Sequence, residues 1–477
     1  MLDVIIIGAG VIGSLIAREL KKYDLNVLLL EKNNDVGNEI SGANSAIVHS
    51  GYDPKPGSLK ALLNVKGNKM FDQISEELDF DFERKGSLTI AFNNDQRMTL
   101  DMLAERAKAN GVEVKILSRD ELIELEPKIS KEAIAALYAP SAGICDPFTM
   151  VANAVENFVD NGGKLKLNEP VLEIKNNGDY LTVITDKGEY STKLVINSAG
   201  LYSDKIAKMI DENFEYEITP RKGIYYLLAR NTPVVNHVCF NVPSNLGKGV
   251  LIAQTTSNNV LVGPNNTLAN SLDDVSTDAT SLEDIKEKAL KNLNFNPLNE
   301  TIRIFAGNRP HIDNFDDFYI DFSKKTEKMI NLVGIESPGL ASSPAIAEYI
   351  IENFVSKVLK LEKNENFNPY VRKHIIPSKI LDLKKKAEFI SQNPDYGTIV
   401  CNCEQVSIGE IKDILSRSVP INSIRALKKR TRAAFGRCQG GFCIPILTKY
   451  LSIYLKKDIT EVLYSENESN ILKERAK

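Results

Sequence analysis

The sequence lacks long apolar runs and carries little net charge. No stretch approaches the roughly 18 consecutive apolar residues that suggest a membrane span, and the short run Val4 to Ile7 has no basic region before it. The 59 basic and 63 acidic residues give a net charge of -4, which offers no argument for nucleic-acid binding. We therefore expect a cytoplasmic protein that binds no nucleic acid and contacts a membrane only through a partner.

Cysteine is scarce, and its distribution is uneven. Four of the six cysteines lie between positions 401 and 443, which favours a metal site in a reducing compartment over a disulfide framework. We expect the other two, Cys145 and Cys239, to be buried thiols. The length of 477 residues and the hydrophobic content of 43% predict two or three domains.

The chain opens with the element order of a dinucleotide-binding unit. Its parts are a strand at 3–7, a loop with Gly8, Gly10 and Gly13, a helix at 11–21, and a strand at 27–30 that is followed by Glu31. The glycines let the backbone approach a pyrophosphate, the helix N-terminus offers N–H donors, and Glu31 can accept from a ribose hydroxyl. An acidic residue at this position disfavours NADP but does not separate NAD from FAD.

Later segments predict that this nucleotide-binding domain is discontinuous. They are a small, polar stretch at 41–51, a buried strand at 195–200, and a strand at 330–340 that is followed by a helix at 343–355. Because these units are spread over most of the chain, we expect a second domain to be inserted between them. Short β-rich stretches typical of its sheet occur at 86–92, 181–185, 223–228 and 259–263.

The residues resemble the FAD-dependent oxidoreductases of the D-amino-acid oxidase and glycerol-3-phosphate dehydrogenase type over roughly residues 1–365. The resemblance is carried by the glycine loop with Glu31 and by the segments 41–51, 55–60, 198–204 and 334–340. It implies an α/β fold, with a Rossmann-like FAD-binding domain and an inserted α+β substrate domain. It is nearest to glycerol-3-phosphate oxidases and dehydrogenases and then to L-2-hydroxyglutarate oxidases, which oxidise an anionic secondary alcohol by hydride transfer to flavin.

The expected domain limits and FAD contacts follow this resemblance. The FAD-binding domain is expected at 1–80, 141–215 and 311–365, the substrate domain at 81–140 and 216–310, a connector at 366–397, a cysteine-ligated domain at 398–456, and a tail at 457–477. The expected FAD contacts are Gly8, Gly10, Gly13, Glu31, Gly42, Ala43, Asn44, Ser45, Val171, Ala199, Gly200, Gly334, Gly339 and Leu340.

Removal of hydride from a carbinol carbon requires a base for the hydroxyl proton, and imidazole has a suitable pKa. Of the four histidines, only His49 lies in a flavin-side loop, and the family has its proposed base four residues after a serine such as Ser45. The alternative is that His49 only hydrogen-bonds the cofactor. We expect the other three, His237, His311 and His374, to be surface or structural residues.

An anionic substrate also needs a fixed cation, and arginine can bind phosphate or carboxylate with two hydrogen bonds. Arg309 matches the family arginine that follows a glycine turn, although Asn308 before it departs from the family pattern. Arg221 and Lys222 are the second choice, and each cation has the alternative of an ordinary solvated charge. Hydroxyl groups for the substrate are expected from Ser45 and Ser337.

The four clustered cysteines form a second motif. Cys401 and Cys403 are spaced C-x-C, Cys438 and Cys443 are spaced C-x4-C, and 34 residues separate the pairs. Structural zinc sites favour C-x2–4-C in both halves, whereas four unevenly spaced thiolates can hold [2Fe-2S]; zinc and free thiols stay open. The block resembles the bacterioferritin-associated-ferredoxin-like [2Fe-2S] domain, which implies a small, mostly helical domain whose four cysteines ligate the cluster.

A basic run at 428–432 lies between the cysteine pairs. It lacks interleaved aromatic residues, so neutralisation of a cluster or docking of an acidic redox partner is favoured over nucleic acid. We expect helices near 381–392, 408–416 and 445–454.

The two motifs together favour a dehydrogenase over an oxidase, because a cluster relays electrons singly and an oxidase has no need of one. The order of domains resembles the large subunit of anaerobic glycerol-3-phosphate dehydrogenases. It implies oxidation of sn-glycerol 3-phosphate, a small anionic hydroxy substrate, with electrons passing to a redox partner protein or a second flavoprotein subunit. The alternatives are a 2-hydroxyacid dehydrogenase, especially for L-2-hydroxyglutarate, and a non-catalytic electron-transfer or redox-sensing subunit.

Overall fold

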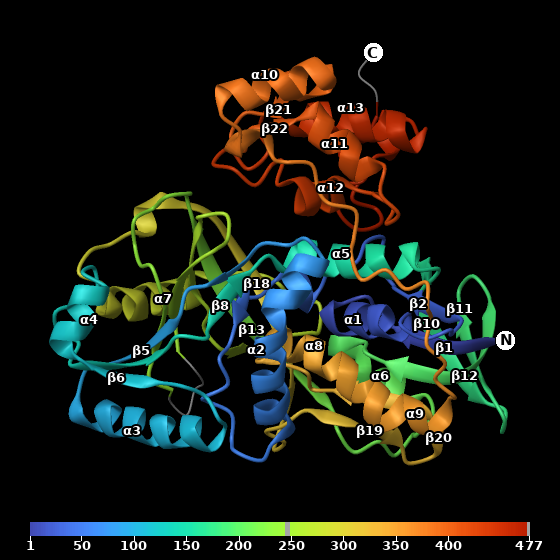
Figure 1. The fold of residues 1–477 in the computed structure, drawn as a ribbon, viewed down its shortest axis with the longest axis horizontal. Helices are drawn as coiled ribbons and strands as arrows, with labels where there is room; N and C mark the ends of the chain where they lie inside the picture. Colours follow the sequence, from blue (N-terminus) through green and yellow to red (C-terminus); the bar gives the residue numbers. More distant parts are fainter. Residues whose placement is uncertain (244–248, 475–477) are drawn as a thin grey trace.

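Two mixed β-sheets, each assembled from segments far apart in the sequence, organise the chain before residue 360. The computed structural model describes residues 1–243 and 249–474, so the end of the predicted tail lies outside the described residues. Figure 1 shows the sheets in the two halves of the molecule, with the C-terminal domain above them and next to α5.

The first sheet has β1 (Leu2–Ile7) between two parallel neighbours, β2 (Val27–Leu30) and β12 (Glu189–Asn197). All four residues of β2 and the last four of β1 are buried, as expected for parallel strands covered on both faces. The remaining strands of this sheet are β9 (Lys164–Lys166), β10 (Val171–Asn176), β11 (Leu181–Thr185), β19 (Tyr319–Ser323) and β20 (Thr326–Val333).

The stretch 181–185, which we listed among the strands of the inserted domain although it lies within the expected FAD-binding limits 141–215, belongs to this first sheet. As β11 it pairs antiparallel with β10 on one side and with β12 on the other. Its alternation of buried and half-buried residues is typical of any antiparallel strand, so the pattern alone predicted the strand but not its sheet.

Helices pack against the first sheet and bury its apolar residues. They are α1 (Val11–Leu20), α2 (Leu59–Glu77), α5 (Pro147–Asp160), α6 (Ser203–Lys208) and α8 (Gly339–Ile350), which continues through a π-helical turn at Ile351–Val355 into α9 (Ser356–Val358). α1 contacts both α5 and α8, and α2 contacts α8. The N-terminus of α1 is thereby fixed next to the glycine loop.

The second sheet contains the long antiparallel pair β13 (Ile218–Leu228) and β18 (Thr301–Ile312). Its other strands are β5 (Ser87–Ala91), β6 (Lys115–Ser118), β7 (Ala135–Ala139), β14 (Val238–Asn241), β15 (Leu251–Gln254), β16 (Val260–Gly263) and β17 (Thr267–Leu268). The helices of this half are α3 (Asn94–Ala109), α4 (Arg119–Leu125) and α7 (Ala279–Asn292). A small sheet of β3 (Ile47–Val48), β4 (Phe82–Arg84) and β8 (Gly143–Cys145) completes the strands before residue 360.

The C-terminal domain is mostly helical and has its own hydrophobic core. It consists of α10 (Leu383–Gln392), β21 (Ile399–Cys401), β22 (Val406–Ser407), α11 (Ile408–Leu415), α12 (Ile424–Thr431) and α13 (Ile444–Leu455). The expected helices α10, α11 and α13 are present. α12 was not expected, and it contains most of the basic run.

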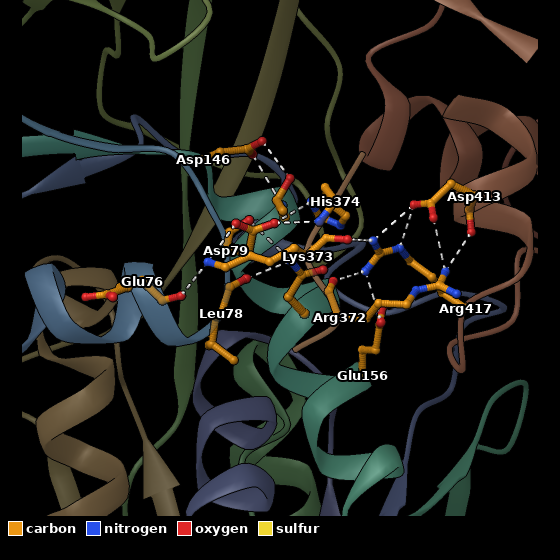
Figure 2. Close-up of polar contacts among 12 residues, drawn as sticks. Glu76, Leu78, Asp79, Asp146, Glu156, Arg372, Lys373, His374, Asp413 and Arg417 are labelled. Carbon is orange, nitrogen blue, oxygen red and sulfur yellow. Dashed lines mark hydrogen bonds and ion pairs between the residues drawn. The ribbon is translucent and has the colours of Figure 1, made fainter. Parts of the chain in front are cut away.

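Buried ion pairs attach this domain to the FAD-binding half. Figure 2 shows the Arg417 guanidinium between Glu156 of α5 and Asp413 of α11. Its nitrogens lie 3.0 Å from a carboxylate oxygen of each. The same guanidinium donates to the carbonyl oxygens of Arg372 and Lys373 in the connector, at 2.8 and 3.1 Å. Lys373 also pairs with Asp79 of the FAD-binding half at 3.1 Å, so the connector is bound to both domains.

A second attachment involves the basic run. Lys429 and Arg430 of α12 pair with the buried Asp35 carboxylate at 2.7 and 2.6 Å. The Lys429 ammonium also donates to the carbonyl oxygen of Val36 and to the side chain of Asn38. These charges are satisfied inside the chain, so the interpretation of this run as a surface for an acidic partner is wrong for Lys429 and Arg430.

None of the helices formed by the described ranges 1–243 and 249–474 combines the length and apolarity needed to cross a lipid bilayer.

Candidate active site and iron-sulfur centre

A cavity of about 1710 Å³ lies at the junction of the glycine loop, the 37–49 segment and the strands β13 and β18. Small-molecule sites commonly occupy about 300–1,000 Å³. The cavity therefore has room for an extended dinucleotide together with a small substrate.

Most of the residues expected to contact FAD line this cavity. They are Gly8, Gly10, Glu31, Ala43, Asn44, Ser45, Val171, Ala199, Gly200, Gly339 and Leu340. Gly13, Gly42 and Gly334 are outside the lining and instead permit close approaches, of backbone at the first two and of the Ile312 side chain at Gly334. A Cβ on Gly13 would lie 2.0 Å from the Gly8 carbonyl oxygen, so the glycine is required for α1 to pack on the loop.

The N-terminus of α1 has the features of a pyrophosphate-binding site. Gly8 has a φ of +99°, and a Cβ there would lie 2.7 Å from the Ser198 carbonyl oxygen. The Val11 backbone N–H, in the first turn of α1, donates to Ser41 Oγ at 2.9 Å. Glycine conformational freedom and a helix N-terminus thus meet in one wall of the cavity, and these residues fit a dinucleotide. Sequence reasoning did not identify Ser41 as a site residue.

Glu31 is buried and accepts backbone hydrogen bonds from Ala9 at 2.8 Å and from Asn33 at 2.9 Å. Burial raises its pKa, and the two N–H donors act in the opposite direction. Each carboxylate oxygen keeps further acceptor capacity, so Glu31 can still accept from a ribose hydroxyl.

His49 lines the same cavity, and its position is fixed from several sides. Its Nε2 lies 3.4 Å from Ser337 Oγ, and its ring stacks on Phe240 at 5.7 Å. The side-chain amides of Asn64 and Asn68 in α2 donate to its carbonyl oxygen at 2.7 and 3.1 Å. The two asparagines are positioning residues that the sequence did not reveal, because their partner is a backbone atom.

The two arginines face each other across the long strand pair. Arg221 of β13 is directly opposite Arg309 of β18 in the antiparallel register, and both line the cavity. Like charges in this position repel unless an anion or a counter-ion lies nearby. Arg221 pairs with Asp313 at 3.1 Å, whereas Arg309 donates to Asn266 and to the Asn265 carbonyl oxygen, both at 3.2 Å.

Lys222 does not line the cavity. Its buried ammonium pairs with Asp274 at 3.0 Å and contacts Ser276 at 3.2 Å. Successive residues of a strand point to opposite faces, so Arg221 and Lys222 cannot both face the cavity. The structure therefore separates Lys222 from the cavity that Arg221 lines.

His311 is a cavity residue that the sequence analysis assigned to the surface or to a structural role. Its Nδ1 lies 3.3 Å from Glu336 Oε1, which also pairs with Lys60 at 3.2 Å. The hydrogen bond to Glu336 raises the pKa of His311. The signal that would have found it is its place two residues after Arg309 on the same face of β18.

The four cysteines of the C-terminal domain form two pairs. Cys403 Sγ lies 3.5 Å from Cys438 Sγ, and the side chains of Cys401 and Cys443 contact each other. A Cβ on Gly436 would lie 2.3 Å from Cys403 Cβ, so only glycine lets the loop approach this closely.

In the part of the chain that the structure describes, no group of three or more His, Cys, Asp and Glu converges on one point as a single zinc ion would require. Two pairs of thiolates would suit a [2Fe-2S] cluster, in which two cysteines ligate each iron. The expectation for Cys145 and Cys239 is confirmed, since both thiols are buried and unbridged.

The fold and the site define a dinucleotide-binding redox protein with a separate cysteine-ligated centre. Residues 3–353 match the FAD dependent oxidoreductase family, and residues 399–452 match the BFD-like [2Fe-2S] binding domain. The chain belongs to the FAD-dependent oxidoreductase family, and its cofactors are FAD and a [2Fe-2S] cluster.

Three known proteins are similar to this chain. Glycerol 3-phosphate dehydrogenase of Caloramator mitchellensis is 45% identical over 99% of this chain and 98% of its own length. L-2-hydroxyglutarate dehydrogenase of Indibacter alkaliphilus is 34% identical over 56% of this chain and 68% of its own. The FAD-bound L-alpha-glycerophosphate oxidase of Mycoplasma pneumoniae has a TM-score of 0.74 and 29% identity, over 79% of this chain and 99% of its own.

Proposed function

We propose that the protein oxidises sn-glycerol 3-phosphate to dihydroxyacetone phosphate and passes the electrons to a partner protein. The observation that supports this most directly is the cross-strand pair Arg221 and Arg309 in a cavity that also contains His49. A phosphate placed between the arginines would relieve their repulsion and make charge-assisted hydrogen bonds. The similarity to the Caloramator mitchellensis enzyme agrees with this substrate.

His49 takes the hydroxyl proton at Nε2 as the carbinol carbon loses its hydride and the C–O bond becomes a carbonyl. Ser337 Oγ, 3.4 Å from Nε2, holds the imidazole orientation and can hydrogen-bond the same hydroxyl. Ser45 Oγ, which contacts the Tyr225 hydroxyl at 3.1 Å, offers a second hydroxyl contact. When bound, FAD accepts the hydride, and the [2Fe-2S] cluster carries the electrons onward one at a time.

A matched pair of histidine variants tests the base. His49→Gln should reduce the rate at which glycerol 3-phosphate bleaches the flavin by about 10²-fold or more, with FAD content unchanged. His237→Gln is the control, because His237 hydrogen-bonds Glu126 outside the cavity. Equal bleaching by both variants would refute the role of His49 as the base.

A matched arginine pair tests the phosphate site. Arg309→Met should raise KM for glycerol 3-phosphate at least tenfold, because the substrate phosphate loses a charged partner. Arg303→Met is the control, since Arg303 lies on the same strand but outside the cavity lining. An unchanged KM in the Arg309 variant would contradict the assignment.

L-2-hydroxyglutarate is the second candidate substrate, because an arginine pair also binds carboxylates and one relative acts on this compound. Anaerobic mixing with each compound separates the two. Flavin bleaching and a reduced [2Fe-2S] EPR signal with only one of them would identify the substrate, and silence with both would refute the proposed function.

A further inference from the structure

Helix α13 carries apolar side chains on the side that faces away from its own domain core. Leu447 and Leu451 are buried in that core. On the side away from that core, the exposed fractions are 43% for Ile446 and 65% for Ile453, and Tyr454 at the border of this side is 41% exposed. Ile446 and Ile453 are seven residues, or two helical turns, apart and therefore lie in one stripe. Figure 1 shows α13 at the outer edge of the molecule, far from both large sheets.

The stripe begins at the cysteine loop. Phe442, directly before the ligand Cys443, is 82% exposed. Of the four cysteines, Cys403 is exposed and Cys438 is half-buried, whereas Cys401 and Cys443 are buried. One thiolate pair is thus near the surface beside the stripe, where a second redox centre can approach closely. Single exposed apolar residues are ordinary, but a continuous stripe beside a redox centre points to a partner.

The charge along the stripe is mostly basic. Arg437, next to Cys438, is 77% exposed and pairs with Glu300 at 3.7 Å, and Lys449, Lys456 and Lys457 are exposed along and after α13. No acidic residue occurs between positions 438 and 457. Residues 398–477 contain 14 basic and 8 acidic residues, although the whole chain is slightly acidic. A partner that covers this surface is therefore expected to have an apolar centre and an acidic rim.

We propose that this surface docks an acidic, electron-accepting protein. We define it as the α13 face: Phe442, Ile446, Ile453 and Tyr454 with the surrounding Arg437, Lys449, Lys456 and Lys457. The inference rests on the proposed function only in assuming that electrons leave through the cluster. Electron-transfer interfaces are commonly small, below about 1,200 Å², which an apolar stripe with a basic rim can supply.

The experiment uses full-length, cluster-loaded protein that has been reduced with stoichiometric dithionite, so its result does not depend on the substrate. The probe is oxidised, acidic plastocyanin, whose copper accepts one electron, and the second-order rate of its reduction is measured at low and high salt. Two variants change the α13 face: Ile446→Ser with Ile453→Ser, and Lys449→Glu with Lys456→Glu and Lys457→Glu. Leu383→Ser is the matched control, because Leu383 is 87% exposed on α10 in the same domain.

Both α13 variants should reduce the plastocyanin at least about tenfold more slowly at low salt, and the charge variant should also lose the salt dependence. The control should match the unmodified protein, and the cluster EPR signal should be the same in all of them. Equal rates in all proteins would overturn the proposal. So would failure of the unmodified protein to reduce the plastocyanin at low salt.

Two other occupants of the α13 face would also overturn the proposal. Co-sedimentation with phosphatidylserine vesicles that the apolar variant loses would assign the face to a membrane surface. A dimer in sedimentation velocity that the same variant dissociates would assign it to a second copy of the chain. Because dithionite supplies the electrons, none of these outcomes is confused with failure of the protein to oxidise glycerol 3-phosphate.

Discussion

The inner and outer surfaces of the C-terminal domain contrast with the usual distribution of side chains in a soluble domain. The inner surface buries charges: Lys429 and Arg430 contact Asp35, and Arg417 contacts Glu156. The outer surface exposes apolar groups such as Phe442 and Ile453. Buried charges are costly when a partner is removed, whereas exposed apolar groups cost little in the isolated chain. The comparison indicates that charge joins the domains of this chain and leaves the apolar surface available for the partner proposed above.

The largest expected effect comes from Asp35→Asn, which leaves Lys429 and Arg430 as buried cations without their carboxylate. We expect the free energy of unfolding to fall by about 3–5 kcal/mol. FAD affinity should fall as well, because Lys429 also binds Asn38, which lines the cavity. Urea unfolding and flavin fluorescence titration measure the two effects.

The control for this variant is Lys412→Met. Lys412 pairs with Asp395 at 2.6 Å, but both side chains are accessible to solvent. Loss of an exposed pair should cost no more than about 1 kcal/mol. Equal effects of the two variants would remove the distinction between buried and exposed charge on which the comparison rests.

Arg417→Met should have the next largest effect, about 2–3 kcal/mol, because Glu156 and two connector carbonyl oxygens lose their donor. Unlike Asp35, Arg417 has no contact with the cofactor loop, so FAD affinity should stay near that of the unmodified protein. The same urea and fluorescence measurements apply. A large loss of FAD affinity would mean that domain docking in general, rather than the Asp35 contacts, holds the cofactor site.

A smaller effect is expected from pH at the same junction. Burial, with the neighbouring Arg417 and Arg372, lowers the pKa of His374 to about 4 from its usual 6.5, and Asp79 and Asp413 act in the opposite direction. The unfolded chain therefore binds a proton that the folded chain excludes. This contribution to stability is complete above pH 6.5 and is lost as the pH falls toward 4. His374→Gln should flatten the dependence of Tm on pH in this window, and an unchanged slope would contradict the prediction.

The smallest effect is expected on the outer surface. Ile453→Ser removes an exposed side chain and should change the free energy of unfolding by less than about 0.5 kcal/mol. A loss above 2 kcal/mol in urea unfolding would show that Ile453 is part of the core after all, and would weaken the case for the α13 face.

Much of the site could be predicted because its signals are local in sequence. The glycine loop, Glu31 and the two cysteine pairs each form a short motif, and the structure brings each motif together. Other features depend on contacts that no local pattern encodes. Asp35 and Arg430 are 395 positions apart, so nothing in the basic run indicated that its charges are neutralised internally.

The other source of error was the face of the strand on which a side chain lies. Lys222 and Arg221 are adjacent, and only the burial of one strand face separates a cavity residue from a structural ion pair. His311 was predicted to be a surface or structural residue, because its partner Glu336 comes from a distant loop. The strand at 181–185 was assigned to the wrong sheet, since pairing with β10 and β12 decides its position.

The contact between α12 and the 35–38 loop also sets an order of events during synthesis. The glycine loop and Asp35 leave the ribosome first, whereas Arg430 emerges 395 positions later. Domains form as the chain emerges, so the first sheet can assemble before α12 does, with one wall of its cavity unsupported. We expect the nascent flavoprotein to capture FAD firmly only after α12 has emerged.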